Sequence, residues 1–138
     1  MTYTLRPHQQ DACDAMLVHD KGQVIIPTGG GKTICMIHDV INNCKYIDNG
    51  MTTVVVAPRI LLAEQLCKEF MEIMDPHNSD PYLHVMHVHS GDTEYTSTTN
   101  PEKIHLYANC ARSMGENCII FTTYHSLHRI MEADIEVN

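Results

Sequence analysis

The chain has 138 residues, 43% of them hydrophobic, which is enough to bury the core of one domain. Its 9 basic and 17 acidic residues give a net charge of −8, which argues against binding nucleic acid through a broad basic face. The sequence shows no long apolar run, no signal peptide and no paired cysteine spacing, which excludes a membrane-spanning protein, a secreted protein and a disulfide scaffold. We therefore expect free thiols and a cytoplasmic location.

The first half of the chain predicts two helices on either side of a short strand. Residues 7–19 read as a helix with a buried side that includes Ala12, Ala15 and Met16, and Val18 at its margin. After a turn, the apolar residues 24–26 predict a strand. Residues 33–43 predict the second helix, because isoleucine and valine recur there at spacings of three and four.

The second half continues the alternation of strands and helices. Residues 53–57 are the clearest strand, since they are apolar on both faces as in a buried parallel sheet. The later elements are a helix at 60–74, a strand at 82–89, a polar loop at 91–100, a helix at 101–114, a strand at 118–122 and a helix at 126–133. This order predicts an α/β fold, a parallel sheet with helices on both faces.

The segment Pro27-Thr28-Gly29-Gly30-Gly31-Lys32-Thr33 follows a strand and opens a helix, which is where phosphate-binding loops occur. Glycines let main-chain N–H groups turn toward an anion, and the helix N-terminus adds further donors. Lys32 can reach the β- and γ-phosphates, and the Thr33 hydroxyl suits a Mg²⁺ ion that touches them. Ile26 replaces the first glycine of the strict pattern, so a glycine-rich turn without a ligand stays the alternative.

This variant loop resembles motif I of DEAD/DEAH-type superfamily 2 helicases, and three other segments match further motifs in the same order. Residues 5–9 resemble the upstream adenine-reading motif, with His8 where tyrosine is usual. Residues 54–65 resemble motif Ia of the branch of restriction-enzyme motor subunits and phage helicases. Residues 121–127 resemble a later nucleic-acid-contacting motif. The chain, 1–138, would be the N-terminal portion of the first RecA-like P-loop NTPase motor domain.

The resemblance implies an ATP-dependent helicase or translocase that uses ATP and Mg²⁺ and acts on single- or double-stranded nucleic acid, with DNA favoured. It implies a bacterial or phage-infected cytoplasm. Lys32 would be catalytic, and Thr33 would bind Mg²⁺. The nucleotide would be bound by Arg6, Gln9, Thr28, Gly29, Gly30, Gly31, Lys32 and Thr33. The nucleic acid would be contacted by Pro58, Arg59, Thr123, Tyr124 and Ser126.

Each of these residues also has an ordinary explanation when it is taken alone. Arg59 fits a solvated arginine near a helix start, Tyr124 fits a packing residue at a strand end, and Gln9 alone carries little information. Their order relative to the phosphate loop is what favours the functional interpretation.

The family hydrolyses ATP with an Asp-Glu pair at the end of an apolar strand, where Asp organises Mg²⁺ and Glu activates water. None of the apolar runs ends in such a pair, and neither Asp134 nor Glu136 follows one. We therefore expect a piece of a motor that lacks its second motor domain, binds nucleotide weakly, does not hydrolyse it and self-associates through open sheet edges. The alternatives are a nucleotide-binding or scaffold module without turnover and a small P-loop kinase, for which segments 58–59 and 123–126 have no use.

Ten histidines raise the question of a metal site. His84, His87 and His89 share one predicted strand, but alternation places His87 and His89 on one face and His84 on the other. Three ligands on two faces do not converge, so we favour solvated or hydrogen-bonded histidines over a metal.

Overall fold

The computed structural model describes residues 5–18, 32–46, 50–75, 77, 82–91, 96–135 and 137, with main chain only for 17 and 42–46. Its elements are α1 (Pro7–Val18), α2 (Lys32–Tyr46), β1 (Thr52–Ala57), α3 (Ile60–Met74), β2 (Leu83–Val88), β3 (Thr96–Ser97), α4 (Pro101–Ser113), β4 (Asn117–Thr123) and α5 (Leu127–Glu132). The predicted strand at 24–26 and the loop residues Thr28, Gly29, Gly30 and Gly31 lie outside the described residues.

The described strands form one parallel sheet in the order β1-β4-β2-β3, which confirms the predicted sheet type. Val55 pairs with Phe121, and Val85 pairs with Ile119, so apolar residues of neighbouring strands lie side by side. β3 is a correction, because it lies within the segment predicted as a loop. Its Thr and Ser carry no apolar signal, and its pairing with β2 defines it as a strand. β1 is an end strand of this described sheet, and self-association through its outer edge stays a prediction.

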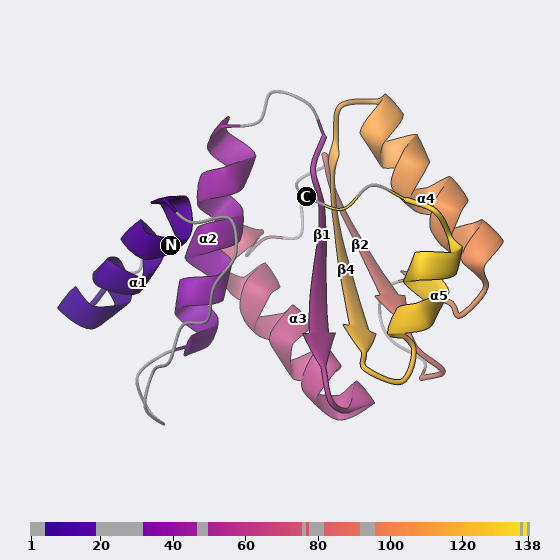
Figure 1. Cartoon of the computed structure of the whole chain (residues 1–138), viewed down its shortest axis with the longest axis horizontal. Coiled ribbons are helices and arrows are strands. Elements are labelled where there is room, and N and C mark those ends of the chain that lie inside the picture. Colours follow the sequence, from indigo (N-terminus) through magenta and orange to yellow (C-terminus); the bar gives the residue numbers. More distant parts are fainter. Residues whose placement is uncertain are drawn as a thin grey trace.

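Helices cover both faces of the sheet, as Figure 1 shows with α2 and α3 on one side and α4 and α5 on the other. The core under α2 and α3 centres on Phe70 and Phe121, whose rings meet edge to face with centroids 5.4 Å apart. The core under α4 and α5 includes Met86, Ile104 and Ile120. Among the described helices, none has the length and apolar character to cross a membrane.

Helix α1 packs against α2 through a narrower face than the sequence predicts. Ala12 and Cys13 are buried there together with Cys35 of α2, whereas Ala15 is exposed and Val18 is 77% exposed. The prediction for Ala15 and Val18 was therefore wrong. α1 packs mainly on a single helix, α2, so only a narrow stripe of its surface is covered.

Where the sheet begins, the main chain of β1 approaches that of the turn before β4. The N–H of Met51 donates to Oδ1 of Asn117 at 3.1 Å, and the N–H of Cys118 donates to the carbonyl of Met51 at 2.8 Å. A Cβ on Gly50 would lie 2.2 Å from the carbonyl oxygen of Glu116, so this approach requires glycine.

Candidate nucleotide and nucleic-acid site

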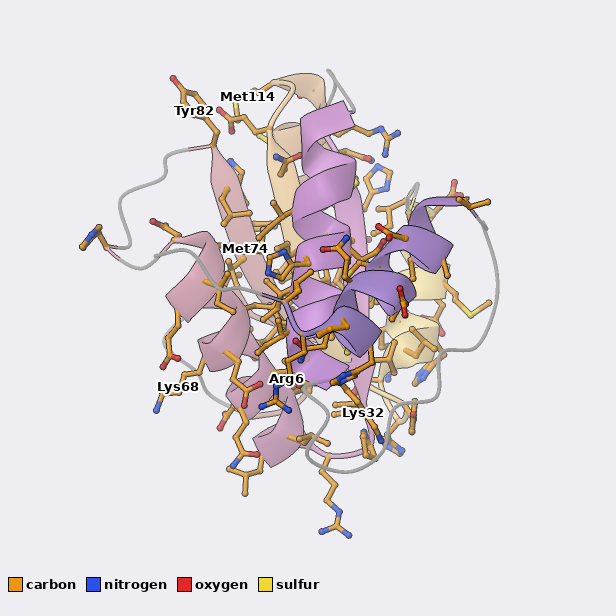
Figure 2. All side chains as sticks on the ribbon, turned by 90° about the vertical axis from the view of Figure 1, so that its left-hand side faces the viewer. Arg6, Lys32, Lys68, Met74, Tyr82 and Met114 are labelled. Carbon is orange, nitrogen blue, oxygen red and sulfur yellow. The ribbon has the colours of Figure 1, made fainter. Side chains whose placement is uncertain are left out.

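The carboxyl ends of β1, β2 and β4 meet at one edge of the sheet, because these strands are parallel and in register. α2 runs in the direction opposite to β1, so its first residue lies toward this same edge (Figure 1). Figure 2 shows Arg6 and Lys32 toward this end and Tyr82 and Met114, which precede β2 and β4, toward the other. Ligands of open α/β sheets bind at such a carboxyl edge.

The first turn of α2 has the chemistry that a phosphate requires. Lys32 is the first residue of the helix and is exposed, and Thr33 beside it is half-buried. No acidic residue lies in this turn, so its main-chain donors and the positive end of the helix dipole are not offset by a local negative charge. Lys32 has an ammonium group that could bind a phosphate, and Thr33 has a hydroxyl that could bind a Mg²⁺ ion.

Gln9 has a structural role that the sequence analysis did not identify. Its Oε1 accepts the main-chain N–H of Arg6 at 2.8 Å, and its side chain is 3% exposed. This bond is one half of a capping box, which satisfies a donor at the start of α1. A glutamine three residues after the cap position is the signal that could have predicted it. To bind an adenine edge, Gln9 would have to exchange this bond for one to the base.

Pro58 and Arg59 are exposed between β1 and α3. Arg59 occupies the cap position of α3 with an extended backbone (φ −139°, ψ 154°), and its carbonyl accepts the N–H of Ala63 at 3.0 Å. Its side chain makes no capping hydrogen bond. The helix therefore fixes the main chain of Arg59 while its guanidinium group faces solvent.

The segment after β4 divides into one exposed and two buried residues. Tyr124 is 66% exposed, and its main-chain N–H donates to the carbonyl of Ala57 at 3.0 Å. Thr123 and Ser126 are buried, and the N–H of Ser126 donates to the carbonyl of Thr123 at 3.1 Å. The structure thus places Tyr124 at the same edge as Arg59, while Thr123 and Ser126 form the turn that holds it there.

Two histidines at the carboxyl end of β2 form a buried pair. His87 Nδ1 and His89 Nε2 lie 3.0 Å apart, which confirms that these residues share a face and are hydrogen-bonded. The N–H of Gly91 donates to His89 Nδ1 at 3.0 Å, so that nitrogen carries no proton and the ring proton lies on Nε2, which donates to His87. Burial lowers the pKa of both rings, that of His87 to about 4, while Glu64 opposes the shift at His89. Both histidines are therefore neutral at pH 7.

His84 lies on the opposite face of β2, as alternation predicts. Its Nε2 pairs with the carboxylate of Glu116, and its ring meets that of Tyr107 edge-on with centroids 6.0 Å apart. Glu116 precedes a different strand, so this partner was not visible in the sequence.

Comparisons with known proteins place the chain in a family and a fold. A family model described as the type III restriction enzyme, res subunit, matches residues 2–137. The structure is similar to that of a nuclease-deletion mutant of the Type ISP restriction-modification enzyme LlaGI in complex with a DNA substrate mimic, with a TM-score of 0.77 and 24% identity over 95% of this chain. It is also similar to the ATP-dependent Type ISP enzyme LlaBIII bound to DNA, with a TM-score of 0.70 and 23% identity over 95% of this chain.

These identities establish a shared fold only. The chain spans 14% of the LlaGI chain and 9% of the LlaBIII chain. No curated protein matches this sequence.

Proposed function

This chain belongs to the family of the type III restriction enzyme res subunit, and from that premise we propose that it is the nucleotide-binding part of an ATP-dependent DNA helicase or translocase. Membership of this family supports the assignment of the chain to a helicase-like motor region that uses ATP. The observation that carries the proposal is the gathering of Lys32, Arg59 and Tyr124 at one carboxyl edge of a parallel sheet. A motor needs its nucleotide site and its nucleic-acid site close to the same sheet edge, so that a conformational change at one site can alter the other.

The nucleotide half of the proposal rests on α2. Lys32 would bind the β- and γ-phosphates with its ammonium group, and the first-turn N–H donors of α2 would bind the same oxygens. Thr33 would hold Mg²⁺, which neutralises phosphate charge when it is bound. Thr28, Gly29, Gly30 and Gly31 would complete the loop, with Arg6 and Gln9 on the adenine side.

The nucleic-acid half rests on Arg59 and Tyr124. An exposed guanidinium group suits a phosphate, and an exposed aromatic ring suits a sugar or a base. The net charge of −8 favours a few local contacts over a broad basic surface. DNA is favoured as the partner, because the two similar structures are of proteins bound to DNA or a DNA mimic.

ATP hydrolysis would require an Asp-Glu pair at the end of an apolar strand, and this sequence has no such pair. The described strands are followed by the residues Pro58, His89, Thr98 and Tyr124, none of which is an acid. We propose that this chain alone binds ATP without hydrolysing it.

The phosphate site can be tested by titrating the chain with a fluorescent ATP analogue in the presence of Mg²⁺. Lys32→Ala should abolish the weak binding that we expect of the wild type, because it removes the charge that faces the phosphates. Lys68→Ala is the matched control, since Lys68 is an exposed lysine on α3 (Figure 2). Equal affinity in the wild type and Lys32→Ala would contradict the phosphate site, and equal loss in both variants would indicate non-specific attraction.

A further inference from the structure

Residues 89–91, which follow β2 and are called the Gly91 turn, contact the start of α3. A Cβ on Gly91 would lie 2.9 Å from Cγ2 of Ile60, so only glycine lets Ile60 pack this closely. Ile60 directly follows Arg59, whose carbonyl is bound by the N–H of Ala63. The main chain of Arg59 is therefore held between its own helix and the Gly91 turn.

The Gly91 turn is itself held by His89. The N–H of Gly91 donates to His89 Nδ1 at 3.0 Å, and the hydroxyl of Ser97 donates to the carbonyl of Gly91 at 2.7 Å. The ring of His89 is fixed on its other side by His87, 3.0 Å away, and the ring of His87 stacks on that of Phe121 with centroids 5.6 Å apart. The ring of His89 therefore cannot rotate without breaking its bond to Gly91 or its bond to His87. His87 is in turn packed on β4 through Phe121.

We propose that His89 is a positioning residue for the nucleic-acid site, which acts by fixing the Gly91 turn, through it Ile60, and so the main chain of Arg59. The proposal rests on the function proposed above for Arg59. His89 is 2% exposed, so it would not contact the nucleic acid itself. An apolar side chain at this position would leave the N–H of Gly91 without its acceptor.

Two conservative substitutions separate the two ring nitrogens of His89. Asparagine places its amide oxygen near the position of Nδ1, so His89→Asn keeps an acceptor for Gly91 and loses the bond to His87. Glutamine reaches the position of Nε2, so His89→Gln keeps the bond to His87 and loses the one to Gly91. Each variant loses one buried hydrogen bond, and a purely structural role would make them equally harmful.

The first readout is hydrogen exchange at the amide of Ala63, with the amide of Cys118 at the far end of the sheet as the reference. We expect His89→Gln to speed exchange at Ala63 by about tenfold relative to Cys118, and His89→Asn to leave the ratio unchanged. Equal ratios in the two variants would overturn the proposal. This readout needs no ligand, so it decides the proposal even if the wild type binds no DNA, an outcome that would instead contradict the proposed function.

The second readout is the affinity for a fluorescein-labelled single-stranded oligodeoxynucleotide, measured by anisotropy. We expect His89→Gln to weaken binding by roughly fivefold and His89→Asn by less than about twofold. In an Arg59→Ala background the difference between the two variants should vanish, because they act through Arg59. A difference that persists in that background would overturn the proposal.

Discussion

The main-chain N–H of Tyr124 donates to the carbonyl of Ala57 at 3.0 Å and so extends the pairing of β1 with β4 by one step beyond Ala57 and Thr123. Two motifs that are far apart in the sequence are joined by this bond. Tyr124 is the donor of this bond and Arg59 lies two residues after its acceptor, and both side chains are exposed. The relative placement of these two residues, both proposed to contact nucleic acid, is therefore set by the register of the sheet rather than by loop conformation.

Arg59→Ala should weaken binding to a single-stranded oligodeoxynucleotide and leave the affinity for an ATP analogue nearly unchanged. One lost phosphate contact should also lower the slope of log affinity against log salt by about 1. Anisotropy titrations at several salt concentrations measure both quantities. Arg112→Ala, in the last turn of α4 at the opposite end of the sheet, is the control and should not change the slope. If Arg59→Ala lost both oligodeoxynucleotide binding and nucleotide binding, the result would indicate misfolding instead.

The elements with the strongest apolar pattern were the best predicted from sequence. The helix at Ile60–Met74 has the predicted bounds, because its apolar stripe packs on the sheet and a strand ends directly before it. β3 was missed because its two residues are defined by main-chain pairing to β2 alone. Hydrophobic periodicity indicates elements that are buried against a broad surface. It does not predict elements such as β3 that are defined by main-chain hydrogen bonds.

The candidate site was predictable in its location and not in its supporting contacts. Strand ends place Arg59 and Tyr124 at one edge, and this follows from a parallel sheet alone. The buried bond of Gln9 to Arg6 and the pairing of His87 with His89 depend on side-chain rotamers, which a sequence pattern does not specify. The alternation of β2 predicted a shared face for the two histidines but not the proton that each ring nitrogen carries.

The stability of the chain should fall in mild acid because of His87. Burial, and then the charge of His89, lower the pKa of His87 from 6.5 to about 4. Between these values the unfolded chain binds a proton that the folded chain does not, so the free energy of unfolding decreases as the pH falls from about 6.5 to about 4. The full loss would be on the order of 3 kcal/mol.

Urea denaturation at several pH values between 7 and 4 measures this loss. His87→Asn keeps an acceptor for His89 and does not titrate, so it is the comparison that cancels the protonation of carboxylates elsewhere. We expect the wild type to lose more stability than the variant over this range. Parallel curves for the two proteins would show that His87 does not bind its proton more weakly in the folded state.

Gly50→Ala should destabilise the chain more than Gly115→Ala does. A Cβ on residue 50 would lie 2.2 Å from the carbonyl oxygen of Glu116 and 2.8 Å from its nitrogen, so the main chain of β1 or of the turn before β4 would have to move. Forcing atoms into a packed region costs about 1–3 kcal/mol, and here the hydrogen bond of Met51 to Asn117 would be disturbed as well. A Cβ on Gly115 meets no atom within 4 Å, so only its left-handed backbone (φ 72°) is penalised, at about 1 kcal/mol. Midpoints of urea denaturation rank the two variants. Equal midpoints would contradict the prediction, because the close approach at Gly50 would then cost no more than the left-handed backbone at Gly115.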